Sequence, residues 1–310
     1  MKKATLILTL LLPVFAALAQ QADTAKLIVH FKFSHLRDTT QRDKPYTENM
    51  VLFAGQNASV YKSYDRKLQQ AMMRKQIEEQ AAQQKGSGNM RFSITSRAPT
   101  SSTEYYQFPA QNKLITKERL ITPYLIEDKM PAINWAISSD TLTIGGVHCQ
   151  KATTHFKGRD YTAWFSPDLP FHTGPWKLNG LPGLIVEAYD KNKEVVFKFD
   201  SMEEATPQIK TVTTDAGPTI KLIGMDDDST DPNVIAIPAD AVRTTQKEFE
   251  KLREAMRKDP QAFGKAVGNG MGGASFGSSG GGAPGSGPKV QVMMGPQAVI
   301  NNPLELPEKP

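Results

Sequence analysis

The sequence predicts a mainly β protein of the α+β class, in which an antiparallel meander forms a curved sheet or an open barrel with one or two docked helices. Three observations support this prediction. Apolar and polar residues alternate with a period of two over much of the chain, which is typical of half-buried strands. Turn-forming Gly, Asp and Asn residues separate these short runs. No helix-length segments lie between the central runs, which disfavours a parallel sheet.

The N-terminal part of the chain shows strands first and a helix afterwards. Residues 25–34 predict a half-buried strand, because one face carries Leu27, Val29, Phe31 and Phe33 and the other carries Ile28, His30 and Lys32. A hairpin is expected over residues 49–54 and 59–64. Residues 65–85 are rich in good helix formers and are followed by Gly86, a stop signal. Their weak apolar stripe predicts a polar surface helix inserted between strands.

The middle of the chain holds most of the expected strands. They are predicted at residues 104–109, 112–117, 119–127, 133–137, 141–144, 146–156, 160–165, 184–190 and 194–200. Beyond them the alternation weakens, with short strands expected at 220–223 and 234–237. Thr245 begins a capping box with Glu248, which predicts a helix with one apolar stripe that ends at Pro260.

Composition divides the chain into four regions. Residues 1–19 have the form of a secretory signal, and residues 20–262 form the β-rich domain with the inserted helix. Residues 263–289 hold nearly half of the 23 glycines and are expected to be a disordered linker. Residues 290–310 are expected to be a tail that docks again on the body.

Export is predicted from the N-terminal stretch. A basic pair precedes an apolar run, and Ala17-Leu18-Ala19 is a small-x-small cleavage site. We expect a mature N-terminus near Gln20 and localisation in the periplasm, in the medium or at the cell surface. An uncleaved anchor is the alternative, which the short run with its Pro13 disfavours. No membrane span is expected after cleavage.

Charge and cysteine content narrow the class of partner. The formal net charge is +5 and becomes +3 once Lys2 and Lys3 are removed, and no dense basic block stands out. Nucleic acid is therefore a poor partner. Cys149 is the single cysteine, so no internal disulfide forms, and a small buried hydrophobe is its simplest role.

The most distinctive stretch runs from Gly174 to Ile185. Its Leu181–Leu184 segment predicts a type II turn, because proline pre-sets φ at the second position and Gly183 supplies the positive φ of the third. The hexapeptide Gly180–Ile185 resembles the signature of the GLPGLI family, exported proteins of Bacteroidetes-type bacteria without an established activity. The residues assigned to this structural motif are Gly174, Pro175, Gly180, Leu181, Pro182, Gly183, Leu184 and Ile185.

Flanking residues extend the resemblance over roughly residues 140–200. Those that match are Cys149-Gln150-Lys151-Ala152, Phe156-Lys157-Gly158-Arg159, Tyr161, Ala163-Trp164-Phe165 and Pro170. The ending Asn302-Pro303-Leu304-Glu305-Leu306 is similar to the Asn-Pro-apolar-Glu-Leu ending common in this family. The helix at 65–85 and the glycine linker depart from the pattern and look like insertions.

Motifs for known chemistries are weak in this chain. Residues 273–277 match G-x-S-x-G but lack the strand and helix that a nucleophile elbow requires. Residues 226–231 are acidic, yet they lack the glycine and the final glutamate of a calcium loop. The best metal candidates are His148, Cys149, His155 and His172, and strand geometry prevents the first three from jointly ligating one ion. The sequence therefore implies no cofactor and no resident metal.

One segment gathers aromatic and polar side chains in irregular structure, where binding residues concentrate. This candidate binding surface consists of Trp164, Asp168, Phe171, His172 and Trp176. The alternative is that both indoles fill the core at one end of the sheet.

The leading functional hypothesis is a noncatalytic binding or accessory module of the cell envelope, whose partner is a peptide, a lipid or an outer-membrane protein. A carboxylate-dependent hydrolase, either a peptidase or a glycosidase, is the rival, with Asp168, Glu187 and Asp190 as its acids. A metal or porphyrin binder using His172 is a third hypothesis. Two carboxylates converging at roughly 5 to 10 Å favour the hydrolase, and an apolar cavity favours a carrier. The oligomeric state stays open.

Overall fold

The computed structural model describes residues 23–83, 99–206, 233–260, 262–263 and 299–308. Within this part of the chain the fold is mainly β, with two α-helices and a large open sheet that is not closed into a barrel. This confirms the predicted class and selects the curved sheet over the barrel. The signal region, residues 220–223, the acidic stretch 226–231 and the glycine-rich linker after Phe263, including the G-x-S-x-G match, lie outside the described residues, whereas Phe263 itself is buried.

The main sheet contains twelve described strands, and every neighbouring pair except one is antiparallel. From one edge to the other the order is β14 (Val242–Thr244), β7 (Pro123–Lys129), β6 (Lys113–Arg119), β5 (Glu104–Phe108), β4 (Ser59–Ser63), β3 (Tyr46–Ala54), β2 (Leu27–His35), β12 (Val195–Glu204), β11 (Leu184–Asp190), β10 (Arg159–Ser166), β9 (Val147–Phe156) and β8 (Ala136–Ile144). A separate pair joins β1 (Asp23–Thr24) to β13 (Val234–Ile235).

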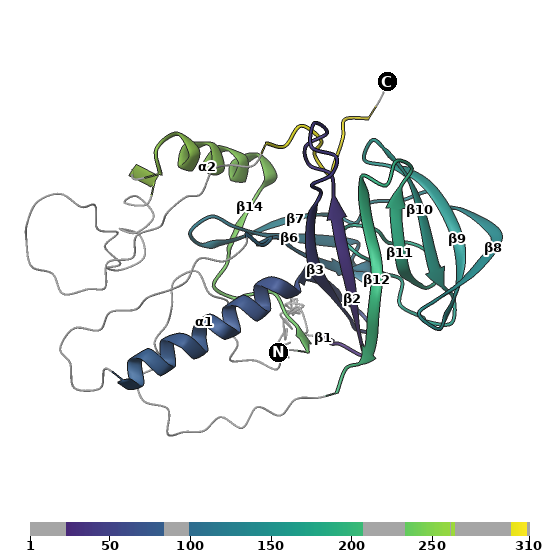
Figure 1. Ribbon diagram of the computed structural model, residues 1–310, viewed down its shortest axis with the longest axis horizontal. Helices are drawn as coiled ribbons and strands as arrows, with labels where there is room; N and C mark the ends of the chain where they lie inside the picture. Colours follow the sequence, from purple (N-terminus) through teal and green to yellow (C-terminus); the bar gives the residue numbers. More distant parts are fainter. Residues whose placement is uncertain (1–22, 84–98, 207–232, 261, 264–298, 309–310) are drawn as a thin grey trace, which may run out of the picture.

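The chain path requires the sheet to curl. From β2 the chain meanders to β7, and then begins again at β8 on the opposite edge and meanders back to β12 beside β2. Only residues 130–135 connect β7 to β8, and they reach about 25 Å when fully extended. In a flat sheet these two strands would lie roughly 48 Å apart. The sheet must therefore bend, and Figure 1 shows β8 to β11 curling away from the central β2 and β12.

Alternation along the strands produces a core on each side of the sheet. On β2, Leu27, Val29, Phe31 and Phe33 are buried inside the curl, as the sequence pattern predicts. The intervening Ile28 packs against the second core, which covers the other face of the β2–β7 half. The curl thus encloses the larger core, and this core also receives the Gly174–Ile185 stretch.

The two helices begin at identifiable signals. Helix α1 (Tyr64–Gln83) follows Ser63, whose Oγ accepts a hydrogen bond from the amide of Arg66 at 3.0 Å. Helix α2 (Gln246–Lys258) begins with the capping box of Thr245 and Glu248. Helix α1 extends away from the sheet in Figure 1, whereas α2 packs its Phe249 against Tyr124 of β7.

Several strand predictions need correction. The two strands expected at 133–137 and 141–144 are one strand, β8, with a register shift between Ile137 and Thr141. Both parts pair with β9, so Asp140 lies within the strand and does not form a turn between two strands. The strand expected at 234–237 is only β13, and the three-residue strand β14 was not predicted.

The turn within the stretch Gly174–Ile185, termed the signature stretch, is also different from the predicted type II turn. The amide of Gly183 donates to Leu181 O at 2.8 Å, which closes a three-residue γ-turn at Pro182. The amide of Leu184 donates instead to Leu169 O at 3.0 Å. Gly183 does have a positive φ, of 153°, but a Cβ there would lie 2.0 Å from Ser166 O. Close approach of two backbone segments is therefore the main reason for this glycine.

Candidate functional site: the tail-binding surface

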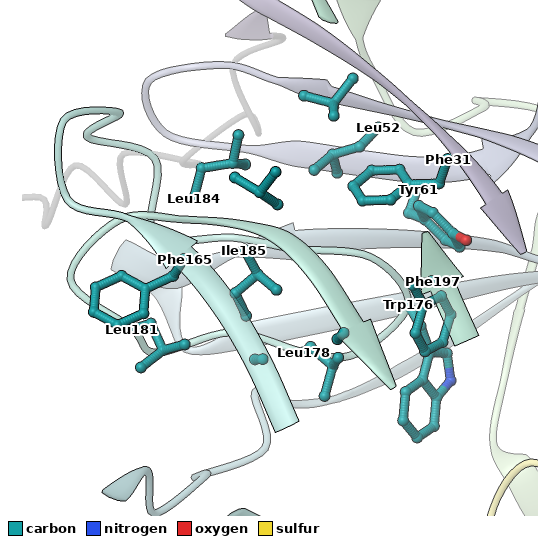
Figure 2. Close-up of a cluster of buried hydrophobic side chains, with 14 of the residues drawn as sticks. Phe31, Leu52, Tyr61, Phe165, Trp176, Leu178, Leu181, Leu184, Ile185 and Phe197 are labelled. Carbon is teal, nitrogen blue, oxygen red and sulfur yellow. The ribbon is translucent and has the colours of Figure 1, made fainter. Parts of the chain in front are cut away.

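The signature stretch, Gly174–Ile185, is buried in the main core, on the concave side of the curved sheet. Its side chains Leu178, Leu181 and Leu184 are fully buried, and Figure 2 shows them in the same cluster as Trp176. Gln107 on β5 donates to the carbonyl oxygen of Trp176 at 3.1 Å, which ties the stretch to the other half of the sheet. The stretch therefore has a structural role.

The candidate binding residues are distributed between the core and the surface. Trp176 has 1% of its surface exposed and stacks on Phe197 with ring centroids 6.3 Å apart, so it is not part of an exposed binding surface. Its φ of 58° is rare for a bulky residue, and burial of the indole offsets that strain. The remaining candidates are the half-buried Trp164 and Phe171 and the exposed Asp168 and His172.

The acids of the hydrolase hypothesis do not form a free pair. Asp190 is buried; its Oδ2 accepts from Arg159 and its Oδ1 accepts from the amide of Glu194. Asp168 is exposed on a loop, and Glu187 is half-buried on β11 opposite Trp164.

The metal candidates are also separated or already engaged. His148 is exposed, and His155 binds two carboxylates. Cys149 is buried, and this burial raises the pKa of its thiol to about 11. Within the described ranges no group of three or more His, Cys, Asp or Glu residues is placed to hold a metal ion.

A different site appears where the described C-terminal segment, Val299–Glu308, lies against one end of the sheet. We call this segment the tail. The residues that contact it are termed the tail-binding surface; they are His35, Leu36, Arg37, Thr39, Asp38, His155, Lys157, Gly158, Arg159, Lys177 and Glu194. Figure 1 shows the tail running past the ends of the strands at the C-terminal side of β2.

The turn between β9 and β10 is shaped to let the tail pass. Phe156 and Arg159 pair directly, so only Lys157 and Gly158 form the connection, and both have positive φ. This is the geometry of a tight hairpin turn whose twist matches the strands. A Cβ on Gly158 would lie 2.7 Å from the Leu306 side chain. Glycine is therefore required both by the turn and by the tail.

Arg159 is the centre of the site. Its guanidinium is buried and its Nη1 donates to Asp190 Oδ2 at 2.7 Å, so the charge is compensated. Nη2 donates to Asn302 Oδ1 at 2.7 Å and to Pro303 O at 2.8 Å. Nε donates to Leu304 O at 3.1 Å. A single buried cation therefore contacts oxygens of three successive tail residues, as the fixed fork of arginine permits.

His35 adds a contact to the tail backbone from the end of β2. Its Nε2 lies 2.8 Å from Asn302 O, so the neutral ring donates this hydrogen bond. Burial lowers the pKa of His35 to about 4, although the hydrogen bond to the carbonyl acts in the opposite direction. The ring is therefore neutral at ordinary pH.

Charge complementarity continues along the exposed part of the tail. Glu305 lies 2.5 Å from Lys177 Nζ and 3.3 Å from Lys157 Nζ. Burial tends to raise the pKa of Glu305, but hydrogen bonds and charge from these lysines lower it overall. Further along, Glu308 binds His155 at 2.9 Å. Hydrogen bonds to Asp160 and then Glu308 raise the pKa of His155.

A family model described as "Protein of unknown function (Porph_ging)" matches residues 155–187, a small part of the chain that includes Arg159 and most of the signature stretch. No curated protein matches. Two solved structures of PNGF-II, in different space groups, are 12% and 11% identical with TM-scores of 0.46 and 0.45. Each match spans 73% of this chain and 32% of the PNGF-II chain. Likeness at this level establishes neither fold nor activity.

Sequence reasoning singled out both halves of this site without joining them. The Phe156–Arg159 match and the Asn302–Leu306 ending were both noted as features of the chain. The one signal in the sequence was that Arg159 directly follows a two-residue turn. A residue at such a strand end is usually exposed, so the sequence alone does not indicate that Arg159 is buried.

Neither described helix has the length and apolar character needed to cross a bilayer.

Proposed function

We propose that this chain is an exported cell-envelope or secreted protein of the GLPGLI type that acts as a noncatalytic module binding an extended peptide segment. The N-terminal stretch ending at Ala19 supports export, and the hexapeptide Gly180–Ile185 supports the family. The observation that carries the binding role is Arg159. Its buried guanidinium holds a segment that lies 143 positions away along the chain.

The contacts have the form expected of peptide recognition. Main-chain groups of the tail are bound without regard to side-chain identity, because Arg159, His35 and the carbonyl of Arg37 all contact backbone atoms. Such contacts give affinity for extended chain, while side-chain contacts give specificity. In this proposal the tail is the resident occupant of a surface built to hold peptide.

Support for binding over hydrolysis comes from the roles that the carboxylates already have. Asp190 compensates Arg159 and also accepts amide hydrogens from Glu194 and Val195. An acid used in this way is a poor nucleophile or general acid, because its lone pairs are already engaged. A peptide or a peptide-like tail of an envelope protein is therefore favoured over a hydrolysable substrate.

The proposal is tested with a fluorescent synthetic peptide that matches residues 299–310 and three full-length proteins. These are the wild-type chain, Asn302→Ala, and the double variant Asn302→Ala/Arg159→Lys. In the first, the tethered tail competes at an effective concentration on the order of millimolar. In the second, the tail is weakened while the surface stays intact. In the third, lysine lacks the fork that contacts several oxygens.

Fluorescence anisotropy is expected to show the tightest binding by Asn302→Ala. Binding by the wild type should be at least roughly tenfold weaker because of competition. Binding by the double variant should also be roughly tenfold weaker or more. If Arg159→Lys fails to fold, Lys177→Met at the half-exposed rim replaces it and should weaken binding in the same direction. Absence of binding by all three proteins, or equal binding by the single and double variants, would overturn the proposal.

A further inference from the structure

Asn302 is the only buried residue of the described tail, and its side chain is polar. Both ends of its amide are bound. Oδ1 accepts from Arg159 Nη2 at 2.7 Å, and Nδ2 donates to Leu36 O at 2.8 Å and to Glu194 Oε2 at 3.0 Å. The backbone of Asn302 is bound as well, to His35 and to Arg37 O. Every polar atom of this residue therefore has a partner in the tail-binding surface.

The arrangement of partners distinguishes an amide from a carboxylate. The two acceptors at Leu36 and Glu194 need a donor between them, and an amide nitrogen carries two hydrogens. An ionised aspartate at position 302 would place an oxygen against a carbonyl and a second carboxylate. Arg159 Nη2 would still donate to one oxygen of the aspartate, but its positive charge is shared with Asp190 and Glu194 and the other oxygen would still face acceptors. A buried acceptor facing other acceptors is costly, since each group has lost its water.

The residue types on either side of Asn302 define the rest of the preferred segment. Pro303 favours extended backbone at the preceding residue and presents its own carbonyl to Arg159. Three positions after the asparagine, Glu305 lies between Lys177 and Lys157. Because these lysines are partly exposed, the acidic position contributes less to selection than the buried amide does.

We infer that the tail-binding surface is an asparagine-selective peptide site, which accepts an extended Asn-Pro segment with an acidic residue three positions after the asparagine and rejects aspartate at the asparagine position. Its occupant is the Asn302 segment of this chain. The inference rests on the proposed peptide-binding function and adds to it the chemistry by which the segment is chosen. Arg159, the Leu36 carbonyl and Glu194 are the specificity-determining groups.

The experiment uses the full-length Asn302→Ala protein and a set of fluorescent peptides matching residues 299–310. The set contains the natural peptide and versions with Asn302→Asp, Asn302→Gln or Asn301→Asp. The last is the matched control, since it makes the same charge change one position earlier. Asn301 is exposed and binds Asp38 and Thr39 at the surface. Titrations at about 0.15 M and about 1 M salt distinguish the effects of exposed charges, which salt screens, from the effects of buried groups, which salt screens much less.

The natural peptide is expected to bind most tightly. Asn302→Asp should weaken binding roughly tenfold or more at both salt concentrations, because an acceptor replaces a buried donor. Asn302→Gln should weaken it too, because the longer side chain displaces the amide. Asn301→Asp should have a small effect that disappears at high salt. Equal weakening by the two aspartate peptides would overturn the selectivity and leave peptide binding intact. Failure of every peptide to bind would instead overturn the proposed function.

Discussion

Two irregular segments of this molecule contrast in how they are held. The signature stretch Gly174–Ile185 places five large apolar side chains among the most completely buried in the chain, with Trp176 as the largest. In the tail, Val299–Glu308, only Asn302 is fully buried; Leu304 is partly buried against the main core, and the other contacts are hydrogen bonds and ion pairs. Apolar burial is large and non-directional, whereas hydrogen bonds are modest in net energy and strict in geometry. Apolar burial therefore dominates the first segment, and directional polar contacts dominate the second.

The largest expected effect is on the core side of this comparison. Trp176→Ala should lower the free energy of unfolding by about 3 to 5 kcal/mol, because it removes a fully buried indole that packs on Phe197 and Phe156. Trp164→Ala is the matched control, since Trp164 is half-buried on β10 and should cost less. Urea denaturation of both variants measures the difference. Equal losses would mean that the two indoles share one environment.

A pH effect is expected next in size and arises at the tail-binding surface. The pKa of His35 is about 4 in the folded protein and near its ordinary value of 6.5 when unfolded. The unfolded chain therefore binds a proton that the folded chain does not, so stability falls as pH drops from about 6.5 to about 4. Above that window His35 contributes no pH dependence. The loss amounts to about 3 kcal/mol at most.

This pH effect is checked by comparing urea midpoints at pH 7 and pH 4.5 for the wild type and for His35→Gln. Glutamine retains an N–H donor but does not titrate in this range. The wild type should lose more stability on acidification than the variant does. An identical pH dependence in the two proteins would show that His35 is not the group responsible.

The backbone of the signature stretch allows two neighbouring glycines to be compared directly. Gly180 and Gly183 both have positive φ, but a Cβ on Gly180 would meet only Trp135 Nε1 at 4.0 Å. Gly180→Ala should therefore cost about 1 kcal/mol from conformation alone. Gly183→Ala adds a collision with Ser166 O and should cost about 1 to 3 kcal/mol more. Thermal melting of the two variants would contradict this account if Gly180→Ala were the more destabilised.

Local patterns in the sequence were sufficient to predict the class of fold. The alternation in β2 and the capping box at Thr245 act within a few residues, so they are readable from the chain itself. The merger of two expected strands into β8 was not readable, because continuous pairing with β9 decides it. The γ-turn at Pro182 depends in the same way on the approach of Ser166 to Gly183.

The candidate site was harder to predict than the fold, because it is formed by contacts between residues far apart in the sequence. Trp164 and Trp176 are alike as residue types, and only the packing of the curled sheet makes Trp176 a core residue and leaves Trp164 partly exposed. Arg159 and Asn302 are far apart in sequence, so no periodicity links them. A polar residue at a strand end is usually solvated, and its burial here follows from the passage of the tail over the β9–β10 turn.

The central claim is that directional contacts from Arg159 and its neighbours hold the tail in place. Hydrogen exchange measured by mass spectrometry over residues 299–308 tests it most directly, in the wild type and in full-length Asn302→Asp and Glu305→Gln proteins.

The amides of Asn301, Asn302 and Leu306 donate to carbonyls of Arg37 and Lys157. These amides should be protected in the wild type and should exchange much faster in Asn302→Asp. Glu305→Gln, which alters only partly exposed ion pairs, should change them little. Exchange of the wild-type tail at the rate of an unstructured peptide, with the sheet still protected, would contradict the claim.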